Sequence, residues 1–318
     1  MNFECSKYIN VIVEIVAREA SKCEWTLLSG GVDTSFIVLV HPRREELKAL
    51  TVDLGGPDVW YASMVARKLK IKSHTIVRPN VKEYLKAVDW VLENIRVIDP
   101  VEVSADVVHY IAMSRAKSMG CSSILSGDGG DELFVGYTFL CNKPESYVRS
   151  WIEERAISSW LPTVYIGQAL GIRVQTPLYT DAVKEIVLKL PLKCLVDEGV
   201  GKALLREALR MYGLVEVASR PKTPVNIGSG SQAMLKMLAS KVSDNMVRLV
   251  EREMGFKPPS KVHAWLAYRF IELGLEAPGK VEGSTACSVC GRLMVKDYCR
   301  FCGAYTNLNG TVLHYMDD

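Results

Sequence analysis

SGGVDTS at residues 29–35 and SGDGGDELF at residues 126–134 are the two stretches that decide the fold of this chain. Both place glycine and serine beside carboxylates, and each follows a short apolar run of the kind that forms a buried strand. Glycine lets backbone N–H groups reach phosphate oxygens, because no Cβ stands in the way. The carboxylates would repel phosphate, so a bound Mg²⁺ is the best explanation for their presence. Together the two stretches predict a single site for a magnesium-bound nucleotide.

Short apolar runs alternate with helical patterns through the first half of the chain. This alternation is typical of an α/β fold with a parallel, doubly wound sheet, in which ligands bind beyond the carboxyl ends of the strands. Residues 143–276 are expected to be mostly helical and to contribute loops to the same site. The predicted strands are residues 25–28, 49–52, 74–77 and 122–125, and the predicted helices are residues 6–22, 60–69, 82–92 and 105–119.

The composition indicates a globular protein with an ordinary surface. The chain has 318 residues, of which 48% are hydrophobic, and this is enough to bury a substantial core. A net charge of +3 without a clustered basic stripe does not favour a nucleic-acid partner. No apolar run approaches the roughly 20 residues of a membrane span, and the first residues lack a signal-peptide core. A cytoplasmic protein that binds no membrane is therefore expected.

The nine cysteines fall into two groups. Five are scattered without a pairing pattern and are expected to be small buried apolar side chains in a reducing compartment. These five are Cys5, Cys23, Cys121, Cys141 and Cys194.

The other four cysteines form two CxxC pairs, Cys287 with Cys290 and Cys299 with Cys302, separated by eight residues. This spacing predicts a structural Zn²⁺ site in a small zinc ribbon, which we expect to support the structure or bind a partner. Two disulfides, a redox pair or an iron–sulfur cluster are the alternatives. The small, polar residues 277–286 read as a linker before the ribbon at residues 287–318.

SGGVDTS resembles the pyrophosphate loop (PP-loop) of the N-type ATP pyrophosphatases, which cleave ATP between its α and β phosphates. No lysine follows the glycines as in a Walker A loop, and the GxGxxG spacing of dinucleotide folds is absent. The resemblance implies that the loop and the start of the next helix hold pyrophosphate and that Asp33 binds Mg²⁺. The alternative is a plain glycine-rich turn between a strand and a helix.

SGDGGDELFVGY, at residues 126–137, is similar to the signature of the asparagine synthetase superfamily. The resemblance implies that Asp128 assists proton removal from the nitrogen nucleophile and that Asp131 is the second Mg²⁺ ligand. Residues 202–209, KALLREAL, and residues 220–222, RPK, are similar to two further motifs of that family. They imply that Lys222 is a catalytic lysine, which stabilises charge on the α-phosphate and on the tetrahedral intermediate.

The same resemblance supplies the nucleotide contacts. Leu27, Ser29 and Val52 are the expected neighbours of the adenosine. The full set of residues implied to bind the nucleotide is Leu27, Ser29, Gly30, Gly31, Asp33, Thr34, Ser35, Val52, Ser126 and Gly127.

Two features depart from the family pattern. Family members that use glutamine begin with a cysteine after the initiator methionine and carry a glutaminase domain, whereas Asn2 stands at that position here. The family's Pro-Phe-Leu-Asp element corresponds to PLYTD at residues 177–181, in which the acid is displaced or replaced. The nitrogen is therefore expected to come from free ammonia, from a separate glutaminase subunit, or from another amine.

The sequence thus predicts a synthetase-like PP-loop domain at residues 1–276, the linker, and the ribbon. The expected function is ATP-dependent amide formation: a carboxylate, for which the resemblance favours the aspartate of asparagine biosynthesis, is adenylated and transferred to an amine. The expected cofactors are ATP, Mg²⁺ and Zn²⁺, with small-molecule substrates and a homo-oligomeric state. The alternatives are a tRNA-modifying adenylating enzyme whose ribbon binds RNA, and a non-catalytic nucleotide sensor.

Overall fold

Five parallel strands form the central sheet, and four of them are the strands that the sequence predicts. The computed structural model describes residues 3–307 and 310–314 of the chain. The sheet has the order β3-β2-β1-β4-β5, so the chain order reverses between the adjacent strands β1 and β4. The strands are β1 (Trp25–Leu27), β2 (Lys48–Val52), β3 (Ser73–Val77), β4 (Ser123–Leu125) and β5 (Arg173–Gln175).

The fifth strand, β5, was not predicted. Of its three residues only Val174 is apolar, and Arg173 is exposed, so the sequence carries no run of buried residues there. Its pairing with β4, in which Ile124 lies opposite Val174, makes it a strand. Tertiary context decides such short edge elements more than local propensity does.

The chain forms two compact units. The first unit comprises residues 1–53, 57–78 and 112–223, and it contains the five-stranded sheet. The second unit comprises residues 54–56, 79–111 and 224–318. The boundary at residues 111 and 112 falls inside helix α5 (Pro100–Ser118).

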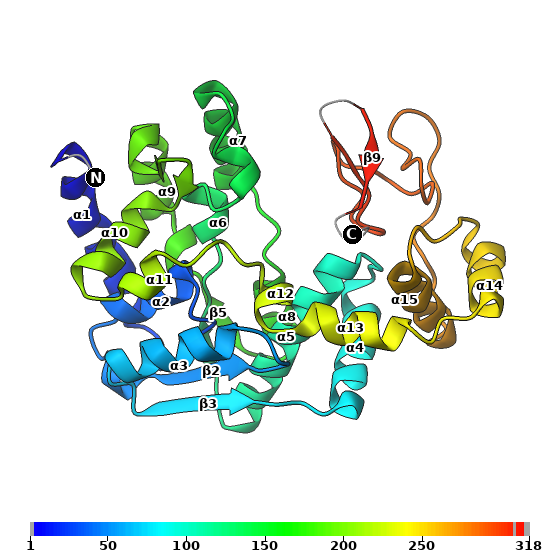
Figure 1. Cartoon of the computed structure of the whole chain (residues 1–318), viewed down its shortest axis with the longest axis horizontal. Coiled ribbons are helices and arrows are strands. Elements are labelled where there is room, and N and C mark those ends of the chain that lie inside the picture. Colours follow the sequence, from blue (N-terminus) through cyan, green and yellow to red (C-terminus); the bar gives the residue numbers. More distant parts are fainter. Residues whose placement is uncertain (1–2, 308–309, 315–318) are drawn as a thin grey trace. The chain divides into compact units, whose positions relative to one another are not determined.

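Amphipathic helices cover the sheet of the first unit. In α1 (Phe3–Ala20), Ile9, Ile12 and Val16 are buried at helical spacing, and this face packs on α2 (Val32–Val40) and α10 (Ala203–Met211). Helix α3 (Asp58–Lys68) packs on β2 and β3 (Figure 1). The other helices of this unit are α6 (Gly130–Leu133), α7 (Glu145–Ile157), α8 (Pro162–Ala169), α9 (Asp181–Lys189) and α11 (Val215–Ala218).

Within the residues that the structure describes, four short 3-10 helices and a two-stranded hairpin complete the first unit. The hairpin strands β6 and β7 run antiparallel. The bounds are η1 (Arg44–Glu46), η2 (Thr138–Leu140), η3 (Pro177–Tyr179), η4 (Leu192–Cys194), β6 (Val196–Asp197) and β7 (Val200–Gly201).

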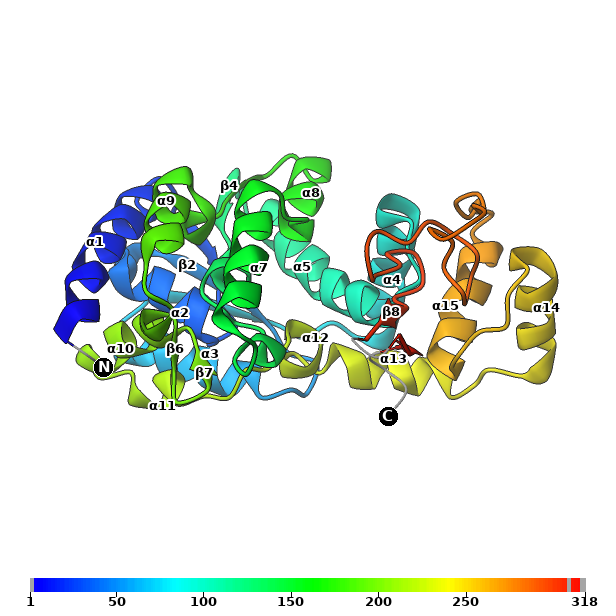
Figure 2. The same cartoon turned by 90° about the horizontal axis from the view of Figure 1, so that it is seen from above.

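The second unit is helical and includes the ribbon segment. Helix α15 (Lys261–Glu272) packs against α14 (Asp244–Met254), and the two lie side by side in Figures 1 and 2. It also packs against α4 (Val81–Ile95), which begins with a capping box formed by Asn80 and Glu83. The remaining elements are α12 (Val225–Gly228), α13 (Ser231–Ala239), β8 (Tyr305–Thr306) and β9 (Val312–Leu313).

The ribbon segment packs on the first turn of α5 within this unit. The Ile98 N–H donates to the carbonyl of Phe301 over 2.7 Å. The Phe301 ring packs edge to face against the ring of Phe270 in α15. Tyr298 donates its hydroxyl to Asp99, whose other oxygen caps the N–H of Val101. The ribbon is therefore tied to its unit by backbone, aromatic and capping contacts.

Of the remaining sequence predictions, the helices over residues 6–22, 60–69, 82–92 and 105–119 correspond to α1, α3, α4 and α5. The domain boundaries at residues 276 and 286 stay a prediction, and residues 308–309 and 315–318 of the predicted ribbon lie outside the described residues. Asn2 lies outside them as well. Among the described residues, no helix is both long and apolar enough to cross a bilayer.

One prediction about cysteines is wrong. Cys5 and Cys194 form a disulfide, although both were expected to be unpaired buried thiols. They are 189 positions apart, and the packing of α1 near η4 brings them together, so nothing in their sequence spacing indicates the pairing. Cys23 and Cys121 are free and buried, as expected, whereas the free Cys141 is only partly buried.

Candidate active site

The two glycine-rich stretches follow the adjacent strands β1 and β4. Thr26 of β1 lies in register with Leu125 of β4, so both loops leave the sheet at its carboxyl edge. This is the point where the strand order reverses, which is where open α/β sheets bind ligands. The predicted placement of both stretches after strands is confirmed.

The first loop owes its shape to Gly30 and to a set of hydroxyl contacts. Gly30 has a φ of 67°, and a Cβ there would overlap the backbone of Tyr61 and Ala62 in α3. The Gly31 N–H donates to Ser29 Oγ over 3.2 Å, and Ser29 Oγ lies 3.2 Å from Thr34 Oγ1. Helix α2 begins at Val32, so Asp33 and Thr34 occupy its first turn.

The second loop packs directly on the first. A Cβ on Gly127 would lie 3.0 Å from Thr34 Cγ2, and one on Gly130 would overlap the carboxylate of Asp33. Glu132 accepts the Gly129 N–H over 3.0 Å and so shapes the start of α6. Glycines at these positions therefore allow the two loops to touch.

Two lysines and two aspartates form a charged cluster where the loops meet. Lys202 Nζ contacts the carboxylates of both Asp33 and Asp131, the latter at 2.6 Å. Lys222 Nζ pairs with the other oxygen of Asp131. The side chain of Lys202 is only 5% exposed, whereas those of Asp131 and Lys222 are 22% and 23% exposed. The predicted site residues Asp33, Asp131 and Lys222 are thus brought together.

Burial and charge act against each other on these carboxyl groups. Burial would raise the pKa of Asp131, but the charges of Lys202 and Lys222 outweigh it and hold this pKa below its ordinary value. Burial raises the pKa of Asp33, which Lys202 only partly offsets. The pKa of Lys202 is raised, because its two carboxylate neighbours outweigh its burial.

Lys202 is the residue of this cluster that was missing from the predicted site. It has a φ of 62°, and its N–H donates to the carbonyl of Phe134 over 2.8 Å. Gly136 lies so close that a Cβ would overlap both Lys202 Cε and Asp131 Oδ1. The only signal in the sequence was the lysine at the start of KALLREAL, and that motif gives no role for it.

Arg220 of the RPK motif joins three segments around the first loop. It pairs with Asp58 at the start of α3, donates to the Ser29 carbonyl over 3.0 Å, and lies 4.2 Å from the centre of the Tyr61 ring. Arg220 and Asp58 are each 4% exposed. This pair fixes the loop and the segment that carries Lys222.

The predicted adenosine neighbours lie at the carboxyl ends of adjacent strands. Leu27 is the last residue of β1, Val52 is the last residue of β2, and both are buried. Ser35, expected to bind the nucleotide, is fully buried, and its hydroxyl has no hydrogen-bond partner among the described residues.

Asp128 is held by hydroxyl groups. Ser126 Oγ donates to Asp128 Oδ2 over 2.9 Å, and Thr163 of α8 donates to the same oxygen. The nearby η3 packs on this loop, since a Cβ on Gly129 would overlap Leu178 and Tyr179. Asp181, the acid of the PLYTD element, has a fully exposed side chain and pairs with Lys184 at 3.6 Å.

The donor set at Asp33 and Asp131 fits a magnesium ion. The two carboxylates converge on one point, where Lys202 now touches both, and Asp33 Oδ1 is buried without a hydrogen-bond partner among the described residues. Gly130 leaves the space beside that oxygen free of a side chain. Two carboxylates with phosphate oxygens are the ligands that Mg²⁺ commonly takes.

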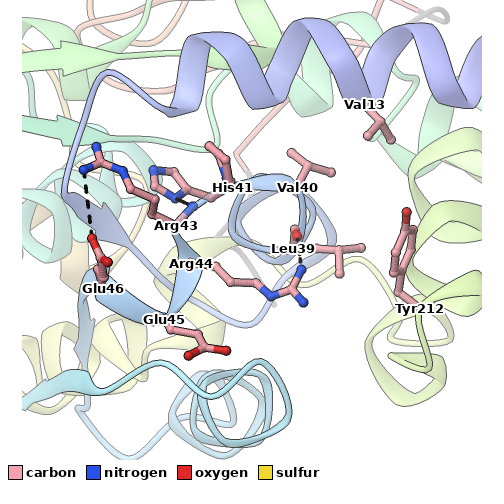
Figure 3. A pocket seen from close by; sticks show the side chains of 10 residues that line it. Val13, Leu39, Val40, His41, Arg43, Arg44, Glu45, Glu46 and Tyr212 are labelled. Atoms are coloured by element: carbon pink, nitrogen blue, oxygen red, sulfur yellow. Dashed lines mark hydrogen bonds and ion pairs between the residues drawn. The ribbon is translucent and has the colours of Figure 1, made fainter.

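A pocket of about 460 Å³ lies at the other end of α2 (Figure 3). It is lined by Leu39 and Val40 at the carboxyl end of the helix, together with Arg44 and Tyr212. Arg44 donates to the Leu39 carbonyl over 3.0 Å, and this contact is drawn in Figure 3. Because Asp33 stands at the opposite end of α2, this pocket is separate from the charged cluster.

The four ribbon cysteines form a second candidate site. Their sulfur atoms all lie within 4.8 Å of one another, and all four side chains are buried. His263 Nε2 lies 3.0 Å from the Cys302 carbonyl, and Arg292 donates to the Cys290 carbonyl over 3.0 Å. Burial lowers the pKa of His263 to about 3, so this imidazole is neutral and Nε2 carries the proton. Four converging thiol groups fit a tetrahedral metal such as Zn²⁺.

The sheet order, the paired loops and the carboxylate cluster define an α/β protein of the class that binds ligands at a topological switch point. The family model described as asparagine synthase matches residues 25–165 and 164–273. The chain therefore belongs to the asparagine synthase family.

Relatives among curated proteins agree with this assignment. The chain is 26% identical to asparagine synthetase B (glutamine-hydrolyzing) of Escherichia coli, over 82% of this chain and 53% of that protein. It is 25% identical to a putative glutamine-hydrolyzing asparagine synthetase of Methanocaldococcus jannaschii, over 71% of this chain and 49% of that protein. The chain spans about half the length of these relatives.

Among solved structures, a predicted subunit of a tRNA methyltransferase from Methanocaldococcus jannaschii matches 63% of this chain and 92% of its own. The match has a TM-score of 0.30 and 16% sequence identity.

Proposed function

We propose that this chain is an ATP-dependent ligase that adenylates a carboxylate and transfers the acyl group to an amine. One observation carries the proposal: Asp33, Asp131, Lys202 and Lys222 converge where the two family loops meet. Membership of the asparagine synthase family supports the same reaction.

Each residue of the cluster has a role that follows from its position. The backbone of residues 29–31 and the first turn of α2 would hold pyrophosphate, because helix N-termini present free N–H groups. Asp33 and Asp131 would hold a Mg²⁺ ion, which supplies charge neutralisation for the phosphates. Lys222 would then stabilise the charge that grows on the α-phosphate and at the tetrahedral centre.

Asp128 would act in the second half of the reaction, in which the amine attacks the acyl adenylate. A base there must lie close to the nucleophile and be ionised. Two hydroxyl donors on Asp128 Oδ2 hold this carboxylate in place beside the second loop. For the carboxylate substrate we favour aspartate, because the relatives are named asparagine synthetases. Free ammonia, a separate glutaminase subunit and another amine remain the three proposed nitrogen sources.

For the ribbon we propose one Zn²⁺ held by the four cysteines. The sulfur geometry and the buried shell around it support a structural role. Metal analysis of the purified chain should give one zinc per chain, and Cys299→Ser should lose it. Stoichiometric iron in place of zinc would contradict the assignment.

Pyrophosphate release tests the proposed reaction. We expect release from ATP in the presence of Mg²⁺, aspartate and ammonium, and we expect Asp33→Ala to abolish it. Release only when tRNA is added would favour the tRNA-modifying alternative. An unchanged rate in Asp33→Ala would show that the site lies elsewhere.

A further inference from the structure

The two carboxylate oxygens of Asp128 differ in their hydrogen bonds. Both hydroxyl contacts, from Ser126 and Thr163, fall on Oδ2. Within residues 3–307 and 310–314, Oδ1 accepts no hydrogen bond. One oxygen is therefore fixed by the protein, and the other is left to accept a proton.

Thr163 reaches this carboxylate from a separate element. It is the second residue of α8 and lies 35 positions after Asp128. Its side chain is fully buried, and among the described residues its hydroxyl has no hydrogen-bond partner except Asp128.

A buried hydroxyl is unfavourable unless it is hydrogen-bonded, and valine would fill the same space without that penalty. Inside helices a threonine hydroxyl often bonds a carbonyl of the preceding turn, but the second position of a helix has no preceding helical turn. The hydrogen bond to Asp128 is therefore the contribution that the Thr163 hydroxyl makes and that a valine would lack.

We propose that Thr163 is a positioning residue for Asp128 in the amide-forming step, and that Oδ1 is the atom that takes the proton. This inference rests on the proposed function. In the step, the amine nitrogen attacks the acyl-adenylate carbonyl and an N–H proton passes to Oδ1. The bond from the acyl carbon to the AMP oxygen then breaks, and the electron pair leaves with AMP.

The adenylation step needs no such proton transfer, because the substrate carboxylate already attacks as an anion. Loss of the Thr163 hydroxyl should therefore slow amide formation and spare adenylation. A purely structural role would slow both steps, and this difference separates the two explanations.

The test compares Thr163→Val with Thr163→Ser in the full chain. ATP–pyrophosphate exchange, which reports adenylation alone, is measured with each of the twenty protein amino acids. Amide formation is then measured by mass spectrometry with the same amino acids and ammonium chloride. We expect Thr163→Val to exchange like the wild type but to form amide roughly ten- to hundredfold more slowly, as for loss of a hydrogen bond to a charged group. Thr163→Ser, which keeps the hydroxyl, should recover most of that rate.

Asp128→Asn is the reference for the amide-forming step, since it should lose amide formation. Equal loss of both steps in Thr163→Val, or an unchanged amide rate, would overturn the positioning role while the proposed function stands. Absence of exchange and of amide formation in the wild type with every compound would overturn the proposed function, and this inference with it.

Discussion

At the scale of single residues, the site depends on one buried lysine between two carboxylates. Lys202 touches Asp33 and Asp131, which come from different loops, and its own side chain is almost fully buried. Its charge compensates two acids that would otherwise repel each other in a region of low dielectric. The arrangement keeps both carboxylates close together before a metal–nucleotide complex arrives.

Lys202→Met tests this dependence. Removing the cation takes away the lysine contact of buried Asp33 and leaves Asp131 with Lys222 alone, so we expect the free energy of unfolding to fall by about 3–5 kcal/mol. Pyrophosphate release should fall by roughly 100-fold or more, as when one stabilising charge is removed from an active site. Urea unfolding without Mg²⁺ and the release assay measure the two effects.

Lys189→Met is the matched control, because that lysine pairs with Glu185 on an exposed face of α9 where both side chains are 70% exposed. Exposed pairs contribute little, so its stability should be unchanged. Equal stability of Lys202→Met and Lys189→Met would contradict the role given to Lys202.

Gly136→Ala is a second test at this scale. The added Cβ would overlap Asp131 Oδ1 and Lys202 Cε, so both groups would have to move. Gly136 does not have a positive φ, so alanine suits its backbone conformation, but the added Cβ would also lie 2.7 Å from Asp131 Cα. We expect at least a roughly tenfold loss of turnover with the fold retained, since misplaced catalytic groups lose about that much or more.

Circular dichroism checks the fold of that variant, and the release assay checks its turnover. Gly279→Ala serves as the control, because a Cβ there meets nothing within 4 Å. Wild-type turnover in Gly136→Ala would show that the close approach is not required.

At the scale of elements, the first turn of α5 and the residue before it contact the ribbon through polar side chains. Glu102 Oε1 of α5 lies 3.2 Å from Arg300 Nη2 of the ribbon. Burial raises the pKa of Glu102 from its ordinary 4.5 to about 8. The folded state thus keeps a proton on Glu102 at pH values where the unfolded chain has released it. Stability from this group is complete below pH 4.5 and is lost as the pH rises to about 8.

Glu102→Gln should remove that pH dependence. Between pH 6 and pH 8 the wild type should lose about 1 kcal/mol of stability per pH unit relative to the variant. Urea unfolding at several pH values with zinc present measures the slope. A wild-type slope equal to that of Glu102→Gln would mean that Glu102 is ionised in the folded protein.

The strands show how far an element can be predicted from sequence. β1, β2 and β4 are mostly buried, whereas β3 is half-buried along its whole length, and all four were predicted to within one residue at each end. β5 has a single apolar residue and exists because it pairs with β4. The carboxylates of the site sit in glycine-rich motifs and were predicted from them. Lys202 and Thr163 were not, because their positions depend on how β7 and α8 pack on the second loop.

At the scale of the whole molecule, one compact unit holds the complete candidate active site. Asp33, Asp128, Asp131, Lys202 and Lys222 all belong to the first unit. Helix α1 and the segment before Lys202 are joined in the same unit by the disulfide between Cys5 and Cys194.

Reduction of this disulfide should lower stability. A bond that closes a loop across 189 positions restricts the unfolded chain strongly, and such bonds typically contribute about 2–4 kcal/mol. We expect a lower midpoint of thermal unfolding with dithiothreitol. Cys5→Ser combined with Cys194→Ser should unfold at that lower temperature with or without the reductant.

Cys141→Ser is the control, because Cys141 is a free thiol in the same unit. An identical midpoint for the oxidised wild type and the double variant would mean that the bond does not form in solution.

The central proposal is that Asp33, Asp131, Lys202 and Lys222 form a site that cleaves ATP between its α and β phosphates. The most direct measurement is phosphorus NMR of the products formed from ATP, Mg²⁺, the twenty amino acids and ammonium by the wild-type chain. We expect AMP and pyrophosphate in equal amounts, and neither product with Asp131→Asn. ADP and inorganic phosphate, or AMP formation that persists in Asp131→Asn, would contradict it.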